Sequence, residues 1–108
     1  MKKINVLGTV YTMCEVAPAE DAKLEGNDGY TDTSTKVIVV DSMQENDPKN
    51  KGNLPEYKKA VKRHELVHAF LYESGLDACS WAPNEELVDW IAIQAPKLLK
   101  AFNDADAL

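Results

Sequence analysis

The chain of 108 residues has little of what marks several large classes of protein. Two cysteines, Cys14 and Cys79, are too few for a secreted disulfide scaffold. One disulfide between them would be long-range, and two separate buried thiols are the favoured interpretation. No apolar run approaches the roughly 20 residues of a membrane span, and the basic start lacks the apolar segment of a signal peptide. We therefore expect a cytoplasmic protein that does not enter a membrane.

Positive charge is also scarce, because 12 Lys and Arg residues stand against 18 Asp and Glu residues, for a net charge of −6. The basic residues between Lys49 and Arg63 lie among acidic ones, so we interpret them as solvated positions on a loop and a helix. An acidic chain without a basic patch is poorly suited to phosphate backbones. The sequence therefore predicts no nucleic-acid partner.

The residues that are present indicate an α+β fold in one domain, residues 1–108. Four short β-prone runs give residues 1–41 the character of a small sheet. They lie at residues 4–7, 9–16, 29–32 and 36–40. We expect three or four strands, largely antiparallel, followed by a loop over residues 42–53, which are rich in Asn, Asp, Lys, Gly and Pro.

A long helix is predicted over residues 54–75. Pro55 suits its first turn, and Gly75 is a typical stop. One helical stripe at 4-3-4-3 spacing is expected to face the core. Its members are Tyr57, Val61, His64, His68 and Leu71.

A second helix is predicted over residues 83–103. Pro96 lies inside this range, and proline removes a helical hydrogen bond, so we expect the helix to be kinked or broken there. Trp81 and Trp90 are expected to anchor the core or an interface.

Histidine occurs only twice, and both residues belong to the motif H-E-L-V-H at residues 64–68. On a helix, His64 and His68 lie one above the other on the same face. They can then bind one metal ion, and Glu65 can reach a water molecule on that ion. Buried without partners, two histidines would cost stability, so they require hydrogen-bond acceptors or a metal.

A catalytic zinc ion takes three protein ligands. Because the chain has no other histidine, a third ligand must be of another type, and the segment N-E-E-L-V-D at residues 84–89 offers carboxylates on the second helix. Glu85 is the leading candidate, and Glu86 is the alternative. Asp89, one turn after Glu85, is expected to orient His64 by accepting its other ring N–H.

Together the two motifs resemble the H-E-x-x-H … N-E-x-x-x-D signature of gluzincin metallopeptidases, the thermolysin-like group. Residues 63–76 and 81–102 also look like small zinc-peptidase-like proteins of phages and prophages of Gram-positive bacteria. They are more distantly similar to the ImmA/IrrE metallopeptidases. The resemblance covers roughly the C-terminal half of the chain, and it points to Glu85 as the third zinc ligand.

The resemblance implies a minimal zincin-like domain that acts as a zinc metallopeptidase on a protein or peptide, in the host cytoplasm if a phage encodes it. Glu65 would accept a proton from the zinc-bound water and pass it to the leaving amine. Substrate would lie extended beside an edge strand. The chain lacks the third histidine that can stabilise the oxyanion, and Tyr72, four residues after His68, is the candidate for that role. The alternatives are a zinc-stabilised interaction module and a zinc hydrolase acting on another amide.

Overall fold

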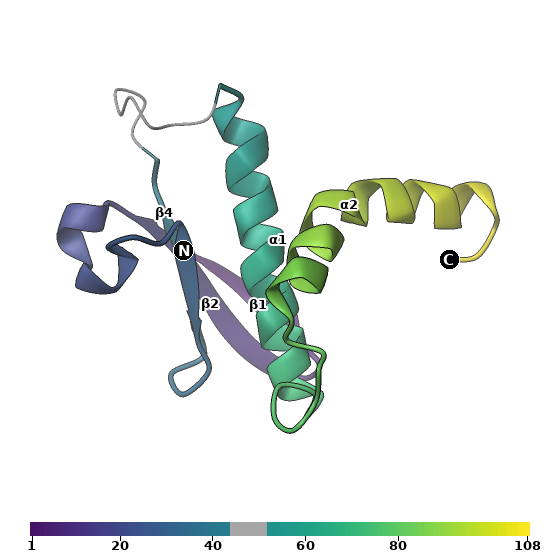
Figure 1. Cartoon of the computed structure of the whole chain (residues 1–108), viewed down its shortest axis with the longest axis horizontal. Coiled ribbons are helices and arrows are strands. Elements are labelled where there is room, and N and C mark those ends of the chain that lie inside the picture. The colour runs from purple at the N-terminus through teal and green to yellow at the C-terminus, as the bar shows by residue number, and fades with distance from the viewer. Residues whose placement is uncertain (44–51) are drawn as a thin grey trace.

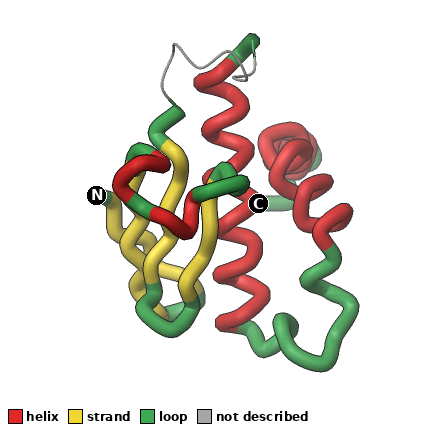
Figure 2. Tube along the Cα trace, turned by 60° about the vertical axis from the view of Figure 1, so that its left-hand side comes forward, coloured by secondary structure: helices red, strands yellow, loops and turns green. Residues whose placement is uncertain are grey.

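The computed structural model describes residues 1–43 and 52–108. Its elements are β1 (Lys2–Val6), β2 (Thr9–Val16), η1 (Pro18–Glu20), η2 (Ala22–Leu24), β3 (Gly29–Asp32), β4 (Val37–Asp41), α1 (Leu54–Glu73) and α2 (Glu85–Asp104). A four-stranded sheet followed by two helices confirms the predicted α+β class. The sheet, α1 and α2 form successive layers, with α1 in the middle (Figure 2).

The sheet has the strand order β1-β2-β4-β3. Its two outer pairings are antiparallel, as predicted, but the central pairing of β2 with β4 is parallel, with Met13 opposite Ile38. Leu7 and Gly8 form the β1–β2 turn, and both have positive φ, at 51° and 93°. Two consecutive residues with positive φ give the turn the twist of the flanking strands, and glycine adopts positive φ without strain. In this strand order, β3 lies at one edge of the sheet.

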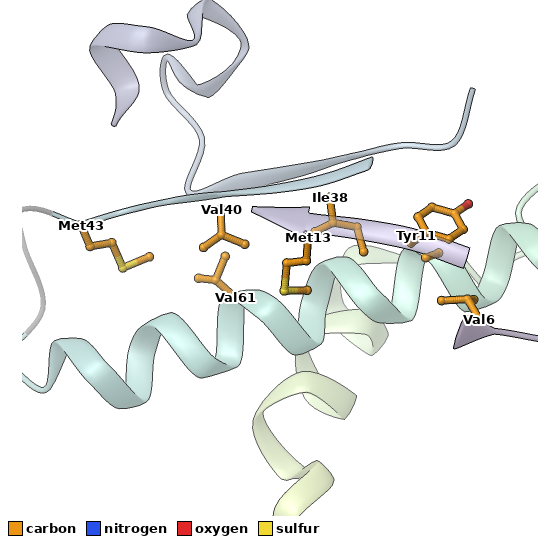
Figure 3. Close-up of a cluster of buried hydrophobic side chains, with 8 residues drawn as sticks. Val6, Tyr11, Met13, Ile38, Val40, Met43 and Val61 are labelled. Carbon is orange, nitrogen blue, oxygen red and sulfur yellow. The ribbon is translucent and has the colours of Figure 1, made fainter. Parts of the chain in front are cut away.

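The core lies between the sheet and α1. Figure 3 shows buried side chains of the sheet pointing toward α1, with Val40 opposite Val61 of that helix. The buried cluster comprises Val6, Tyr11, Met13, Ile38, Val40, Met43, Val61 and Ala69. Burial of consecutive residues in β4 agrees with its uninterrupted apolar sequence, because both of its faces are covered.

The end of α1 follows from the local sequence. Gly75 has φ 83°. Its N–H donates to the Tyr72 carbonyl at 3.1 Å, while the Leu76 N–H donates to the Leu71 carbonyl at 2.9 Å. This pair of bonds is the Schellman motif, which satisfies the last carbonyls of a helix and favours glycine at the left-handed position. The predicted stop at Gly75 is confirmed.

The most buried line on α1 differs from the predicted stripe. It comprises Val61, Glu65 and Ala69, which are spaced four residues apart. His64 and His68 lie beside this line and are only partly buried. The expectation that both histidines face the core is therefore corrected. Glu65, a charged residue, is the member of the motif that faces the sheet most directly.

The second helix begins at Glu85, two residues later than predicted. Asn84 caps it, because its Oδ1 accepts the Leu87 N–H at 3.2 Å. The helix is not broken at Pro96 but continues to Asp104. Its axis turns along its length, and its C-terminal part extends away from α1 (Figure 1).

A side chain from α1 compensates for the proline. Pro96 has no N–H, so the carbonyl of Ala92, four residues earlier, lacks its helical donor. The Nε of Arg63 donates to this carbonyl. Val88 and Ala92 are almost fully buried on the same side of α2. This contact therefore holds the first half of α2 against α1.

Trp81 and Trp90 do not anchor the core, which was one of the two roles predicted for them; the other, at an interface, stays a prediction. The exposed fractions of Trp81 and Trp90 are 76% and 51%. Ile93, Leu99 and Phe102 are also exposed on α2. None of these residues belongs to the buried cluster between the sheet and α1.

Both cysteines are free thiols. The interpretation of two buried thiols is corrected, because Cys14 is only half-buried and Cys79 is exposed. Of the loop expected over residues 42–53, residues 44–51 lie outside the described part of the chain. Neither helix among the described residues is long and apolar enough to cross a membrane.

Candidate metal centre

Three side chains from two helices converge on one point. In α1, His64 and His68 bring their Nε2 atoms to 3.2 Å from each other. Glu85 at the start of α2 places one carboxylate oxygen 3.1 Å from His64 Nε2 and the other 2.8 Å from His68 Nε2. The ligand-type atoms of this group all lie within 4.8 Å of one another. The structure thus brings together the three residues that the sequence motifs single out.

Asp89 contacts one ring. Its Oδ1 lies 2.6 Å from His64 Nδ1. Because a carboxylate accepts hydrogen bonds, this contact favours a proton on Nδ1, the tautomer in which Nε2 can bind a metal ion. This is the arrangement by which carboxylates orient histidines that bind metals. The predicted role of Asp89 has the geometry it requires.

The donor set fits a zinc ion. Two imidazole nitrogens and one carboxylate are the ligands of many catalytic zinc sites. Ligands about 2.0–2.1 Å from a tetrahedral ion lie about 3.3 Å from each other. The separations of 2.8–3.2 Å in this group are close to that value. The side chains of His64 and His68 are only about one fifth exposed, whereas that of Glu85 is 66% exposed, so the group opens toward solvent on the α2 side.

Glu65 lies beside this group and is 8% exposed. The hydroxyl of Thr31 in β3 lies 2.9 Å from its Oε1 and 3.0 Å from its backbone carbonyl. Burial raises the pKa of the Glu65 carboxyl, although the Thr31 hydrogen bond and the two histidines favour its charged form. A raised pKa makes the Glu65 carboxylate a stronger base toward a water molecule beside it.

The second carboxylate oxygen of Glu65 has no hydrogen-bond donor among the described residues. No buried side-chain oxygen in residues 1–43 and 52–108 lacks a partner. The second oxygen is therefore accessible from the cleft that Glu65 lines. The strand β3 lies close to Glu65 at this point, because a side chain on Gly29 would approach the Val39 carbonyl at 2.9 Å and Glu65 Cγ at 3.4 Å.

The cleft has a volume of about 820 Å³. Its walls come from β3 and the segment before it, from α1 and from the first half of α2. The metal-ligand group and Glu65 lie in this space together with residues 27–31 of the edge-strand region. An extended ligand can therefore reach the group along β3.

Other residues considered from the sequence lie elsewhere. Glu86 lines a separate hollow with Trp90 and is not part of the histidine group. Tyr72 does not line the cleft, and its ring lies 4.8 Å from the Nζ of Lys36. The structure therefore favours Glu85 over Glu86 as third ligand and does not bring Tyr72 to the site.

Two other tyrosines line the cleft. Tyr57 donates to Asp28, and Tyr30 donates to Asp21 at 2.5 Å. These hydrogen bonds to carboxylates raise the pKa of each phenol to about 12, so both are protonated near neutral pH. The sequence does not single out Tyr30 and Thr31, because their proximity to the histidines arises only when β3 packs on α1. Tyr57 shares the predicted stripe with His64, but spacing alone does not assign it a role at the site.

No family model, no curated protein and no solved structure matches the chain. The resemblance to gluzincin metallopeptidases therefore rests on the two motifs and on the geometry of the residues in them.

Proposed function

We propose that the protein is a zinc-dependent metallopeptidase. One observation carries the proposal: His64, His68 and Glu85 place their ligand atoms within 4.8 Å of one another in an open cleft, beside the buried carboxyl of Glu65. The His/His/Glu set is the donor chemistry of zinc peptidases, and Glu65 occupies the position of their general base.

Each residue has a role that follows from its contacts. A bound zinc ion would supply a water of lowered pKa and polarise the scissile carbonyl. Glu65 accepts a proton at its free carboxylate oxygen and later donates it to the leaving amine. Asp89 keeps the proton of His64 on Nδ1. Thr31 holds the other oxygen of Glu65.

We place the substrate beside β3. This strand pairs with β4 on one side only and forms an edge of the sheet, and Gly29, Tyr30 and Thr31 line the cleft. An extended peptide can add to such an edge through backbone hydrogen bonds. A protein or peptide is therefore the substrate class that the cleft favours.

The first test is metal content, measured by mass spectrometry on protein purified without a histidine tag. We expect one zinc per chain, lost in His68→Ala. In peptide cleavage assays, Glu65→Gln should retain zinc and lower kcat/KM by at least about 100-fold, because it cannot take up the proton. Absence of zinc after zinc is offered to the folded protein would refute the proposal.

A second candidate is a zinc-stabilised interaction module with little or no turnover. It is favoured by the state of the tyrosines that line the cleft, since both donate their hydroxyls to carboxylates and are not directed at an oxyanion. A panel of proteins, short peptides and small amides separates the two candidates. Zinc binding without cleavage of any member would support the module.

A further inference from the structure

The side chains that line the cleft carry an excess of negative charge. Among the described residues that line it are five carboxylates, and none is Lys or Arg. They are Asp28, Glu65, Asp77, Glu85 and Asp89. A divalent ion on the metal-ligand group would neutralise only two of these charges. The cleft would therefore remain negative when it holds a metal.

This charge is not compensated as it is elsewhere on the molecule. Outside the cleft, lysines pair with carboxylates: Lys58 and Lys62 with Glu15, and Lys36 with Glu73. Within it, Asp28 accepts from the neutral hydroxyl of Tyr57. Asp77 has neither an ion pair nor a hydrogen bond of its side chain with any residue in 1–43 or 52–108. The fold thus leaves unneutralised carboxylates in the one cleft that contains the metal-ligand group.

Two of these carboxylates lie on opposite sides of the metal-ligand group. Asp28 binds Tyr57, Gly29 approaches Val61, and Thr31 binds Glu65, so β3 runs alongside α1 in the same direction. Tyr57 is seven residues before His64, about 10 Å along the helix axis. An extended peptide covers that distance in about three residues.

The opposite end of the cleft carries Asp77. This residue follows the C-terminal end of α1 at Glu73, and it lines the same cleft as Asp28. Since His68 precedes the end of α1 by about one turn, we infer that the metal-ligand group lies between the two carboxylates. A peptide passing along β3 would meet one before the group and the other after it.

We propose that the cleft selects peptide segments with Lys or Arg side chains, and that Asp28 and Asp77 recognise these side chains on either side of the metal-ligand group. The proposal rests on the proposed peptidase function and specifies its substrate class. A cationic side chain gains an ion pair with a carboxylate that has none in the free protein, whereas an acidic segment meets only like charge.

Binding to the Glu65→Gln variant tests the proposal without cleavage of the probe. Three fluorescent octapeptides of Ala and Gly would carry two Lys, two Ser or two Glu residues, and their affinities would be measured by anisotropy with and without zinc. We expect the Lys peptide to bind at least about five-fold more tightly than the Ser peptide, with a preference that weakens at high salt. The Glu peptide should bind most weakly.

Matched variants locate the effect. Adding Asp28→Asn or Asp77→Asn should each weaken binding of the Lys peptide by about two- to five-fold and leave the Ser peptide unchanged. Glu20→Gln, which removes one exposed carboxylate outside the cleft, should change neither affinity. Equal affinities for the three peptides, no binding of any, or an equal effect of Glu20→Gln would overturn the proposal.

The same peptides separate this inference from the proposed function. Cleavage of all three by the zinc-loaded protein at equal kcat/KM would retain the peptidase and refute the charge preference. Selective binding of the Lys peptide without cleavage by the zinc-loaded native chain would retain the preference and contradict the peptidase.

Discussion

Burial of Glu65 lowers the stability of the fold but holds its carboxyl where it can transfer a proton. The residue is 8% exposed and packs beneath β3, where a charge is disfavoured. Thr31 offsets part of that cost through one hydrogen bond, and the cleft solvates the other oxygen. The side chain is thereby held with one oxygen fixed and one available for proton transfer.

We expect Thr31→Val to lower kcat/KM by roughly ten- to a hundred-fold while Thr31→Ser stays near the native value. Valine has the shape of threonine but cannot donate to Glu65 Oε1, and a lost hydrogen bond to a charged group is worth about 1.5–3 kcal/mol. Zinc content should stay at one per chain, because Thr31 contacts no metal ligand in the structure. Equal activities of the two variants would contradict a positioning role.

For single residues, the sequence predicts the candidate metal ligands better than it predicts how deeply each residue is buried. The spacing of H-E-L-V-H and N-E-E-L-V-D places His64, His68, Glu85 and Asp89 on defined helix faces, and the structure brings these residues together. Helical spacing does not determine which face packs on the sheet. The contact between Thr31 and Glu65 spans 34 positions and has no local signal.

Among the elements, α2 depends on α1 for more than apolar packing. Pro96 deprives the Ala92 carbonyl of its helical donor, and Arg63 supplies one from α1. Arg63 is adjacent to His64, and Ala92 lies two turns beyond Glu85, so the contact fixes the two halves of the metal-ligand group relative to each other.

We expect Arg63→Met to weaken zinc binding and to destabilise the fold by about 1–3 kcal/mol, because the Ala92 carbonyl then lacks a partner. Pro96→Ala restores a helical N–H to that carbonyl. The double variant should therefore recover most of the stability lost in Arg63→Met, as measured by urea unfolding and zinc titration. Additive losses in the double variant would exclude this coupling.

The end of α1 was predictable because its cap at Gly75 is local. The start of α2 was predicted two residues early, although the Asn84 cap also acts within a few residues. The parallel pairing of β2 with β4 was not predictable, because the register of Met13 with Ile38 depends on where the intervening β3 lies. Continuity of α2 through Pro96 depends on Arg63, which belongs to another helix.

At the scale of the whole molecule, ionic contacts add to the apolar core in joining α1 to the sheet. Near the C-terminus of α1, Glu73 accepts from Thr9, Tyr11 and Lys36. The Lys36 ion pair, with the Tyr11 and Thr9 hydrogen bonds, lowers the pKa of the Glu73 carboxyl. A carboxylate at a helix C-terminus opposes the helix dipole, so these donors also compensate for an unfavourable position.

We expect this contact to make the fold sensitive to acid. Because the pKa of Glu73 is lower in the folded chain than its ordinary value of 4.5, its stabilising effect is complete above that value. It is lost as the pH falls through 4.5 and then through the lowered folded value. The urea midpoint of the metal-free protein should decrease over this range, and less so in Glu73→Gln. Glu56→Gln, in an exposed pair with Lys59, should follow the native curve.

Zinc should act on the stability of the entire molecule, because its ligands belong to two helices. His64 and His68 lie on α1 and Glu85 on α2, so an ion that binds all three links α2 to the rest of the fold. A ligand that binds only the folded state stabilises it by about 2.7 kcal/mol at 100 times its Kd. For a chain of 108 residues, this corresponds to a rise in Tm of roughly 10–20 °C. Calorimetry with and without zinc measures the shift, and His68→Ala should abolish most of it.

The two neighbouring glutamates should differ in their effect on this Tm shift. Glu85→Gln should reduce the shift strongly while Glu86→Gln leaves it intact, since Glu86 lies outside the group. An equal shift in the two glutamate variants would show that α2 does not supply its ligand through Glu85.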